Sequence, residues 1–422
     1  MSSFVIKGKK SLNGNVEVSG AKNEVLKLIP LSLILSKPIS IDNSPEIEDV
    51  KKQLELLRLL GGEYQFEGSQ LRLNSQNITN FTLNRELSTK LRASIVYTGP
   101  LLSRFKRANI FCPGGCAIGL RSIDSHLDAF RQCGVEISHE ANGSYFLEAK
   151  KNEGEVSIQM AEKSVTATEN IILYLAKSSL VATISNFARE PEVMDLIRII
   201  NLAGGRINEN SDGFLRIEGV EDLSVERVSA LPDRIEAGTF ALAIALTGGS
   251  GTVSPYIEKD LRSFTKVIRD CNVNISVKDD VAYIEKSDDI KPFVIETAPY
   301  PGFPTDLQSP MSLLAAKANG KSIIREKMFD NRLGYLKQLQ KMGLKVEMVG
   351  PNEAQIFGPT DFVSCNVESP DLRSGITLLI AALMAQGESI IEKAQIIDRG
   401  YEKVEQKLNN LGAQIIRRED AV

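Results

Sequence analysis

The sequence lacks the long apolar runs, the cysteine pattern and the excess of one charge that mark several large classes of protein. Its longest mainly apolar stretches, such as residues 376–385, are about half the length that a membrane-spanning helix needs. Five cysteines in 422 residues form an odd and low count, unlike a disulfide scaffold. Fifty basic and 54 acidic residues give a formal charge of −4, without the basic footprint of a nucleic-acid-binding protein. We therefore expect a soluble, cytoplasmic protein with neither a membrane nor a nucleic acid as partner.

Common site motifs are absent as well. The chain has no GxGxxG, no P-loop lysine motif and no defensible Ser-His-Asp set. A zinc site needs four ligands, and Cys112, Cys116 and His126 are one short. We therefore expect no metal site.

An amphipathic helix pattern that ends at a small residue recurs six times, about every 70 residues. Glycine and asparagine tolerate the left-handed conformation that ends many helices. Upstream of each such helix lies a more apolar segment, which predicts a buried helix followed by a short strand. The chain therefore predicts an α/β (α+β) fold of six repeated helix–strand–helix–strand units. The terminating residues are Gly61, Gly134, Gly204, Asn272, Gly343 and Gly412.

Six units are most simply two domains of three units each, with a boundary near Pro232. The sixth unit ends after one strand, whereas the N-terminal stretch stands alone and predicts a hairpin that turns at Asn13-Gly14. This stretch could supply what the sixth unit lacks. We therefore predict one domain at residues 21–230, which carries the Cys116 loop. The second comprises residues 1–20 plus 231–422 and carries Asp306 and Arg399.

The buried helices begin with unusually polar residues. A helix N-terminus offers unpaired N–H groups and a partial positive charge, which suit a phosphate or a carboxylate. If the three helices of each domain are parallel, two sets of N-termini can face each other across an interdomain cleft, where we place the active site. Ordinary caps and solvated charges explain any single one of these residues equally well. The cations that would build an anion site are Lys22, Arg92, Arg121, Arg332, Arg373 and Arg399.

The most distinctive loop is FCPGGCAIGLR, residues 111–121. Its Pro-Gly-Gly run breaks regular structure, and Cys116 follows where the backbone is free to move. Arg121 could lower the pKa of this thiol and make it a thiolate or a proton donor. A buried structural cysteine is the alternative, but it suits a glycine-rich loop poorly.

A second unusual turn is FPTDLQ, where Asp306 stands at the start of a buried helix. Its carboxylate could accept a proton from a substrate hydroxyl, or it could simply cap the helix. Arg332 and Arg399 stand at equivalent points of the fifth and sixth units, which suggests a pair of ligand clamps.

With these residues in hand, the sequence resembles the family of UDP-N-acetylglucosamine enolpyruvyl transferases. The motifs span the whole chain in order. They are SGAKN (19–23), TKLRASI (89–95), PGGCAIG (113–119), AREPEV (188–193), LPDRIEAGTF (231–240), FPTDLQ (303–308), DNR (330–332), DLR (371–373) and IDRGYE (397–402).

The resemblance implies a fold and a reaction. The fold is a two-domain inside-out α/β barrel with three repeats per domain. The reaction transfers the enolpyruvyl group of phosphoenolpyruvate to the 3-hydroxyl of UDP-N-acetylglucosamine, through a tetrahedral ketal and with release of phosphate. It is the first committed step of peptidoglycan precursor synthesis. The family needs no metal or organic cofactor, and its partners here would be the two small-molecule substrates.

The resemblance also implies roles for individual residues. Four match catalytic positions: Cys116 as general acid and covalent nucleophile, Asp306 as acceptor of the sugar hydroxyl's proton, and Lys22 and Arg399. Phosphoenolpyruvate would be bound by Lys22, Asn23, Arg121, Arg332, Asp371, Arg373 and Arg399. UDP-N-acetylglucosamine would be bound by Arg92, Arg121, Ser122, Ile123, Asp124, Ser125, Ser164, Val165, Asp306 and Met328.

Three residues depart from the family pattern. Glu24 replaces a small residue and would add negative charge beside the anion site, Ser122 replaces a proline and would loosen the nucleotide-binding turn, and Tyr300 replaces a frequent histidine. Two alternatives therefore stay open within the fold: transfer to shikimate 3-phosphate, and a weak paralogue that senses UDP-N-acetylglucosamine. An RNA 3′-phosphate cyclase, built from related repeats, would need a nucleophilic histidine and a nucleotide-binding motif.

Overall fold

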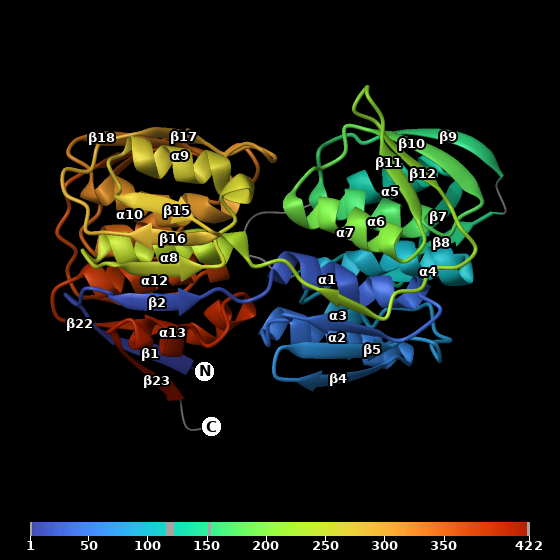
Figure 1. Cartoon of the computed structure of the whole chain (residues 1–422), viewed down its shortest axis with the longest axis horizontal. Helices are drawn as coiled ribbons and strands as arrows, with labels where there is room; N and C mark the ends of the chain where they lie inside the picture. Colours follow the sequence, from blue (N-terminus) through green and yellow to red (C-terminus); the bar gives the residue numbers. More distant parts are fainter. Residues whose placement is uncertain (1, 115–121, 151–152, 420–422) are drawn as a thin grey trace. The chain divides into compact units, whose positions relative to one another are not determined.

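Strands from distant parts of the chain join into small sheets, with helices packed against them, in the computed structural model of the protein (Figure 1). The structure describes residues 2–114, 122–150 and 153–419. These residues fall into two compact units. We call residues 20–231 the central unit, and residues 2–19 together with 232–419 the terminal unit; both names refer to the described residues only.

The central unit has three sheets in its described residues, with strand orders β13-β3-β5-β4, β6-β8-β7 and β11-β12-β10-β9. Its strands are β3 (Ile39–Asp42), β4 (Glu63–Glu67), β5 (Gln70–Asn74), β6 (Arg107–Phe111), β7 (Val135–His139), β8 (Ser144–Ala149), β9 (Gly154–Gln159), β10 (Leu180–Ser185), β11 (Arg206–Glu209), β12 (Leu215–Glu218) and β13 (Arg227–Ser229). Its helices are α1 (Lys22–Leu31), α2 (Glu48–Leu60), α3 (Arg85–Ser88), α4 (Thr98–Phe105), α5 (Asp124–Gln132), α6 (Val165–Leu175) and α7 (Pro191–Leu202), with 3₁₀ helices η1 (Ser32–Ile34) and η2 (Arg92–Tyr97).

The terminal unit also has three sheets in its described residues, ordered β15-β16-β14-β2, β17-β18-β20-β19 and β21-β22-β1-β23. Its strands are β1 (Ser2–Lys7), β2 (Gly14–Glu17), β14 (Gly251–Ser254), β15 (Ile275–Lys278), β16 (Val281–Ile284), β17 (Val294–Glu296), β18 (Lys321–Arg325), β19 (Lys345–Gly350), β20 (Glu353–Phe357), β21 (Asn366–Glu368), β22 (Glu388–Glu392) and β23 (Gln414–Glu419). Its helices are α8 (Arg234–Leu246), α9 (Arg262–Asp270), α10 (Gln308–Lys317), α11 (Leu336–Lys341), α12 (Leu372–Met384) and α13 (Val404–Asn410), with 3₁₀ helices η3 (Glu258–Leu261), η4 (Thr305–Leu307) and η5 (Ala394–Arg399).

The four-stranded sheets share one pattern of pairing. One edge strand runs parallel to its neighbour, and the other pairs are antiparallel; β17 and β18, for example, are parallel. The same holds for β9 with β10, β13 with β3, β2 with β14 and β21 with β22. Because the strand beside each parallel edge is followed by a turn into a surface helix, equivalent loops recur in every sheet of this kind.

The N-terminal stretch does not form the hairpin that Asn13-Gly14 predicts. β1 lies between β22 and β23 and is antiparallel to both, whereas β2 runs parallel to β14 in another sheet. The burial of Phe4 and Ile6 in one sheet and of Val16 in the other outweighs the local turn preference. The N-terminal residues thus complete two sheets made mostly of residues beyond 250.

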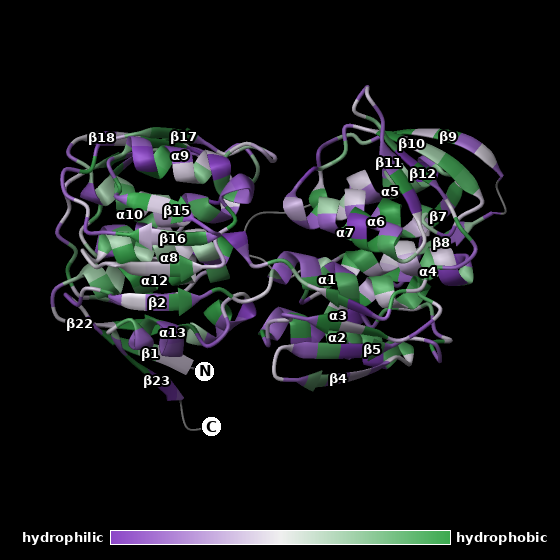
Figure 2. Cartoon of the chain, viewed as in Figure 1, coloured by the Kyte–Doolittle hydropathy of each residue, from purple (hydrophilic) through white to green (hydrophobic). Residues whose placement is uncertain are grey.

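The predicted helix terminations are confirmed at all six positions. Gly61, Gly134, Gly204, Gly343 and Gly412 have φ between 76° and 104°, and Asn272 has φ of 66°. The apolar segments form buried helices, as predicted; every residue of α12 is buried, and so is every residue of α8 after the first. Surface helices such as α9 carry both polar and apolar residues (Figure 2).

Each unit has its own hydrophobic core. In the central unit α4 packs against α6, and in the terminal unit α10 packs against both α8 and α12. These contacts confirm the mixed α/β class that the sequence predicts. None of the helices in the described ranges is both long and apolar enough to cross a membrane.

Candidate active site

In the terminal unit, three predicted site residues come together around one carboxylate. Arg332 Nη2 lies 2.6 Å from Asp306 Oδ1, and Arg373 Nη2 lies 3.0 Å from Asp306 Oδ2. The arginine side chains are only 6% and 5% exposed, whereas that of Asp306 is 25% exposed. The structure therefore places a partly accessible carboxylate between two buried cations.

Different elements deliver these side chains. Asp306 lies in η4, which Pro304 precedes, and Arg332 lies in the turn before α11. Arg373 is the second residue of α12, whose N-cap Asp371 accepts hydrogen bonds from Arg373 N at 2.9 Å and Ser374 N at 3.0 Å. Asp371 thus fixes the start of the helix that carries Arg373.

Arg373 is also held by Tyr401. Its Nη1 donates to Tyr401 Oη at 3.1 Å, and its guanidinium lies 5.4 Å from the centre of the tyrosine ring. Burial disfavours the charged form of Arg373, but the nearby Asp306, Tyr401 and Asp233 more than offset it and raise its pKa above the usual value. The cation is therefore permanent.

The other predicted residues of this unit lie on neighbouring loops. Arg399 ends η5, just before α13. Met328 follows β18, and its N–H donates to Glu326 Oε1 at 2.8 Å. Tyr300 Oη donates to Lys259 O at 3.3 Å in the turn before Asp306.

In the central unit, Lys22 begins α1 and is buried. Its Nζ lies 2.7 Å from Asp49 Oδ2, and Asn23 follows it in the same first turn. Sequence reasoning missed Asp49. A signal was present, since Asp49 lies on the buried face of α2, one turn before the buried amide of Gln53.

Arg92 and the predicted nucleotide-binding turn are joined by hydrogen bonds. Arg92 Nη2 donates to Ser122 O at 2.7 Å, and Asp124 N donates to Ser122 Oγ at 2.9 Å. Ser122 Oγ itself donates to the Asp124 carboxylate, and Ser125 Oγ donates to Glu162 Oε1 at 2.5 Å. The serine that replaces proline thus ties the turn together through its own hydroxyl. Ile123, the N-cap of α5, is buried.

Ser164 and Val165 stand at the start of α6, where Ser164 Oγ accepts from Ala167 N at 3.4 Å. Nearby, His126 is fully enclosed; Asn170 Nδ2 lies 3.0 Å from its Nδ1 and Thr166 Oγ1 lies 3.1 Å from its Nε2. Burial, assisted by Arg92, lowers the pKa of His126 to about 3. His126 is therefore a neutral packing residue and no general base.

Glu24 lies in the interior of the central unit. It is 1% exposed, and its Oε2 accepts from Leu231 N at 2.7 Å. Burial, with the neighbouring Asp195, raises the pKa of Glu24 well above its usual value. The expectation that this residue adds negative charge beside Lys22 is wrong, because the low-dielectric site favours the neutral carboxyl.

Two predicted residues, Cys116 and Arg121, lie outside the described residues. Among those described, no cluster of His, Cys, Asp and Glu has the geometry to hold a metal ion.

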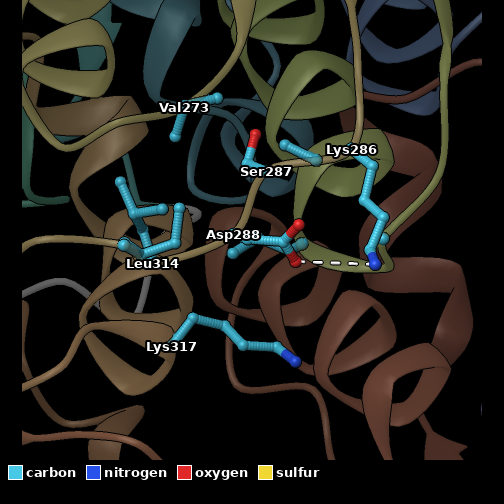
Figure 3. Close-up of a pocket in the computed structure, with 10 residues that line it drawn as sticks. Val273, Lys286, Ser287, Asp288, Leu314 and Lys317 are labelled. Atoms are coloured by element: carbon cyan, nitrogen blue, oxygen red, sulfur yellow. Dashed lines mark ion pairs between the residues drawn. The ribbon is translucent and has the colours of Figure 1, made fainter.

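One cavity of about 140 Å³ lies away from the residues discussed so far (Figure 3). It is lined by the C-terminal ends of α8 and α10 and by the loop at 286–290, where Lys286 lies 3.5 Å from Asp288. None of the predicted site residues that the structure describes lines this cavity. We do not count it as part of the candidate site.

Comparison with solved structures shows the class of fold. Over 99% of its length the chain aligns with the enolpyruvyl transferase NikO from Streptomyces tendae, at a TM-score of 0.89, 24% identity and 98% coverage of that chain. It aligns with the EPSP synthase from Acinetobacter baumannii at a TM-score of 0.77 and 14% identity, with 99% of this chain and 100% of the other covered. These likenesses show the enolpyruvyl transferase fold.

Sequence similarity then gives the family. The family model described as EPSP synthase (3-phosphoshikimate 1-carboxyvinyltransferase) matches residues 6–408. The chain is 38% identical to UDP-N-acetylglucosamine 1-carboxyvinyltransferase 3 of Caldanaerobacter subterraneus, with 99% of both chains covered. It is 36% identical to UDP-N-acetylglucosamine 1-carboxyvinyltransferase 2 of Bacillus subtilis, with 99% of this chain and 97% of the other covered. The chain belongs to the EPSP synthase family, and within it to the relatives named UDP-N-acetylglucosamine 1-carboxyvinyltransferase.

Proposed function

We propose that this protein transfers the enolpyruvyl group of phosphoenolpyruvate to the 3-hydroxyl of UDP-N-acetylglucosamine and releases phosphate, in the synthesis of peptidoglycan precursors. The observation that carries the proposal is full-length similarity, at 35–38% identity, to relatives named for this activity. The carboxylate held between two buried arginines supports it. The reaction requires no metal or organic cofactor.

The reaction needs one proton acceptor, one proton donor and several fixed cations. Asp306 takes the proton of the sugar hydroxyl as that oxygen bonds to C2 of phosphoenolpyruvate, and Cys116 donates a proton to C3. Loss of phosphate from C2 and of a proton from C3 then converts the tetrahedral ketal into the enol ether. Phosphoenolpyruvate carries a phosphate and a carboxylate, which Lys22, Asn23, Arg121, Arg332, Arg373 and Arg399 bind, with Asp371 orienting Arg373.

The arginine pairs of Asp306 suggest how substrate binding prepares the base. Both guanidinium groups donate to this carboxylate. An incoming phosphate or carboxylate competes for the same N–H groups. Once they turn to the substrate, Asp306 becomes a better proton acceptor at the moment when one is needed.

The proposal assigns the acceptor substrate to loops of both units. UDP-N-acetylglucosamine contacts Arg92, the stretch of residues 121–125, Ser164, Val165, Asp306 and Met328. We further propose that each unit is an inside-out α/β barrel of three repeats, with its buried helices inside and its sheets outside. The repeated pairing pattern of the sheets and the complete burial of α12 support this.

The test is phosphate release from phosphoenolpyruvate, measured with and without UDP-N-acetylglucosamine. We expect release that depends on the nucleotide sugar in the wild type and that is lost in Cys116→Ala. Cys112→Ala is the matched control, because Cys112 is an exposed thiol four residues earlier and should be dispensable.

The same assay examines the alternatives. The family model's own name makes shikimate 3-phosphate the second acceptor to test. Release with shikimate 3-phosphate alone would overturn the proposal in favour of that acceptor. A folded protein that binds UDP-N-acetylglucosamine and releases no phosphate would overturn it in favour of a sensor.

A further inference from the structure

A buried carboxylate that has no role in the reaction above stands beside the loops that do. Glu326 directly follows β18 and is 0% exposed. β17 runs parallel to β18 and ends one residue before Thr297. Because parallel neighbours end at the same sheet edge, Glu326 and Thr297 emerge together there. Thr297 is itself fully buried.

Glu326 accepts four hydrogen bonds from three separate segments. Its Oε1 accepts from Thr297 Oγ1 and Met328 N, each at 2.8 Å, and from Phe329 N at 3.2 Å. Its Oε2 accepts from Thr305 Oγ1 at 2.8 Å. All four donors are uncharged.

The burial of the Glu326 carboxylate among uncharged donors has a free-energy cost. Moving a carboxylate out of water costs several kcal/mol before compensation, and neutral donors compensate less than a cation would. An apolar side chain of the same size would avoid this cost only if the four donors were lost as well, because each would otherwise be left unpaired. What an apolar residue cannot do is fix the relative positions of three loops through directed hydrogen bonds.

Two of the three segments are ones that the proposed reaction uses. Thr305 immediately precedes Asp306 within η4. Met328 and Phe329 open the loop that leads to Arg332, whose guanidinium lies 5.3 Å from the Phe329 ring centre. The ion pair between Arg332 and Asp306 is a second link between these two loops, beside the one through Glu326.

We propose that Glu326 is a positioning residue for Asp306: through Thr305 it fixes the turn that carries the base against the loop that carries Met328 and Arg332. The inference rests on the proposed function and deepens it. Glu326 touches neither substrate. It acts by holding the carboxylate of Asp306 at the point where the sugar hydroxyl arrives.

The sharpest test removes one hydroxyl. Thr305→Val keeps the shape of the side chain and loses its bond to Glu326, whereas Thr305→Ser keeps the hydroxyl. Because small misplacements of a reacting group can cost as much as about 100-fold in rate, we expect kcat of Thr305→Val to fall by about tenfold or more. KM for phosphoenolpyruvate and for UDP-N-acetylglucosamine should stay within about twofold, since Met328 N keeps its bond to Glu326. Thr305→Ser should restore kcat to within about threefold of the wild type.

A matched control separates positioning from stability. Thr265 is a buried threonine of the same unit, and its hydroxyl lies 2.7 Å from Tyr256 Oη. Thr265→Val should lower the melting temperature about as much as Thr305→Val and leave kcat per folded molecule unchanged. Glu326→Gln is the second variant; its amide oxygen can still accept from Met328 N and its NH₂ can donate to Thr305 Oγ1, so it should retain more activity than Glu326→Ala.

The outcomes are distinguishable. If the wild type is active and Thr305→Val is equally active, the role of Glu326 is overturned and the proposed function stays intact. The same holds if Thr305→Ser is as slow as Thr305→Val. A folded wild type that releases no phosphate in the presence of UDP-N-acetylglucosamine overturns the proposed function and this inference with it.

Discussion

At the scale of single residues, two buried glutamates occupy matching positions in the two units but have opposite surroundings. Glu24 and Glu236 are the third residues of α1 and α8, and each accepts a hydrogen bond from a backbone N–H of the segments that join the units, at 2.7 and 2.8 Å. Lys407 lies 2.7 Å from Glu236, whereas the acidic Asp195 adjoins Glu24. Burial raises the pKa of both glutamates; Lys407 partly offsets the rise at Glu236, whereas Asp195 adds to it at Glu24.

Glu24→Gln should flatten the pH dependence of stability. The folded-state pKa of Glu24 is raised, so its contribution is fully present below about pH 4.5, the unfolded value, and is lost as pH rises through the folded value. The amide keeps the acceptor for Leu231 N and can donate to Asp195. We therefore expect the free energy of unfolding at pH 8 to rise by about 1 kcal/mol. Urea denaturation from pH 5 to 8 measures it.

Glu236→Gln is the matched control. There the same substitution leaves Lys407 facing a neutral amide in a buried site, so stability should fall at every pH in this range. Shifts of the same sign in both variants would contradict the proposed effect of Lys407 beside one glutamate and Asp195 beside the other.

Some residues of the candidate site could be predicted from the sequence, and others could not. Asp306, Arg332 and Arg373 stand in recognisable turns and helix starts, so their clustering could be predicted from the sequence. The burial of Asp49 follows from the amphipathic pattern of its helix, but its pairing with Lys22 could not be predicted, because tertiary packing brings the two together. Glu326 could not be predicted either, since its importance depends on donors from distant segments.

At the scale of elements, the six helix terminations show which local signals are strong. A left-handed residue is required after each surface helix, and only glycine or asparagine meets that requirement cheaply. The buried helices were equally predictable, since helices that are apolar on most sides are buried. The sequence could not predict that the N-terminal strands separate, because a two-residue turn motif carries no information about distant sheets.

Gly343→Ala tests the termination of α11. Gly343 has φ of 100°, where a Cβ is strained although the nearest atom, Asp361 O, is 3.5 Å away. We expect a loss of about 1–2 kcal/mol, measured by thermal unfolding.

Gly350→Ala provides the comparison in the strand that follows. Gly350 has no positive φ and its Cβ would meet open space, so alanine should change stability by less than about 0.5 kcal/mol. An equal loss at both glycines would show that strain is not the cause.

At the scale of the whole molecule, the N-terminal residues belong to the terminal unit, most of which comes from the C-terminal half of the chain. β1 pairs with both β22 and β23, and Phe4 within it is completely buried. The stability of residues 232–419 therefore depends on residues 2–7, whereas the central unit has no strand from this stretch.

Phe4→Ala should destabilise the terminal unit by about 3–5 kcal/mol, because it opens a cavity in a closed core. Hydrogen exchange should show lost protection in β22 and β23 and unchanged protection in α1 and α2. Val294→Ala, at a site 57% exposed, should have no measurable effect. Uniform loss of protection in both units would refute the assignment.

The placement of β1 has a consequence for how the protein is made. Synthesis proceeds from the N-terminus, and domains fold as units when their residues become available. The described residues of the central unit all lie between residues 20 and 231, so this unit can fold while the rest is still being translated. β1 leaves the ribosome first, yet both of its partners lie beyond residue 387. The earliest segment of the nascent chain is therefore among the last to find its place, and it waits unpaired through almost the whole of translation.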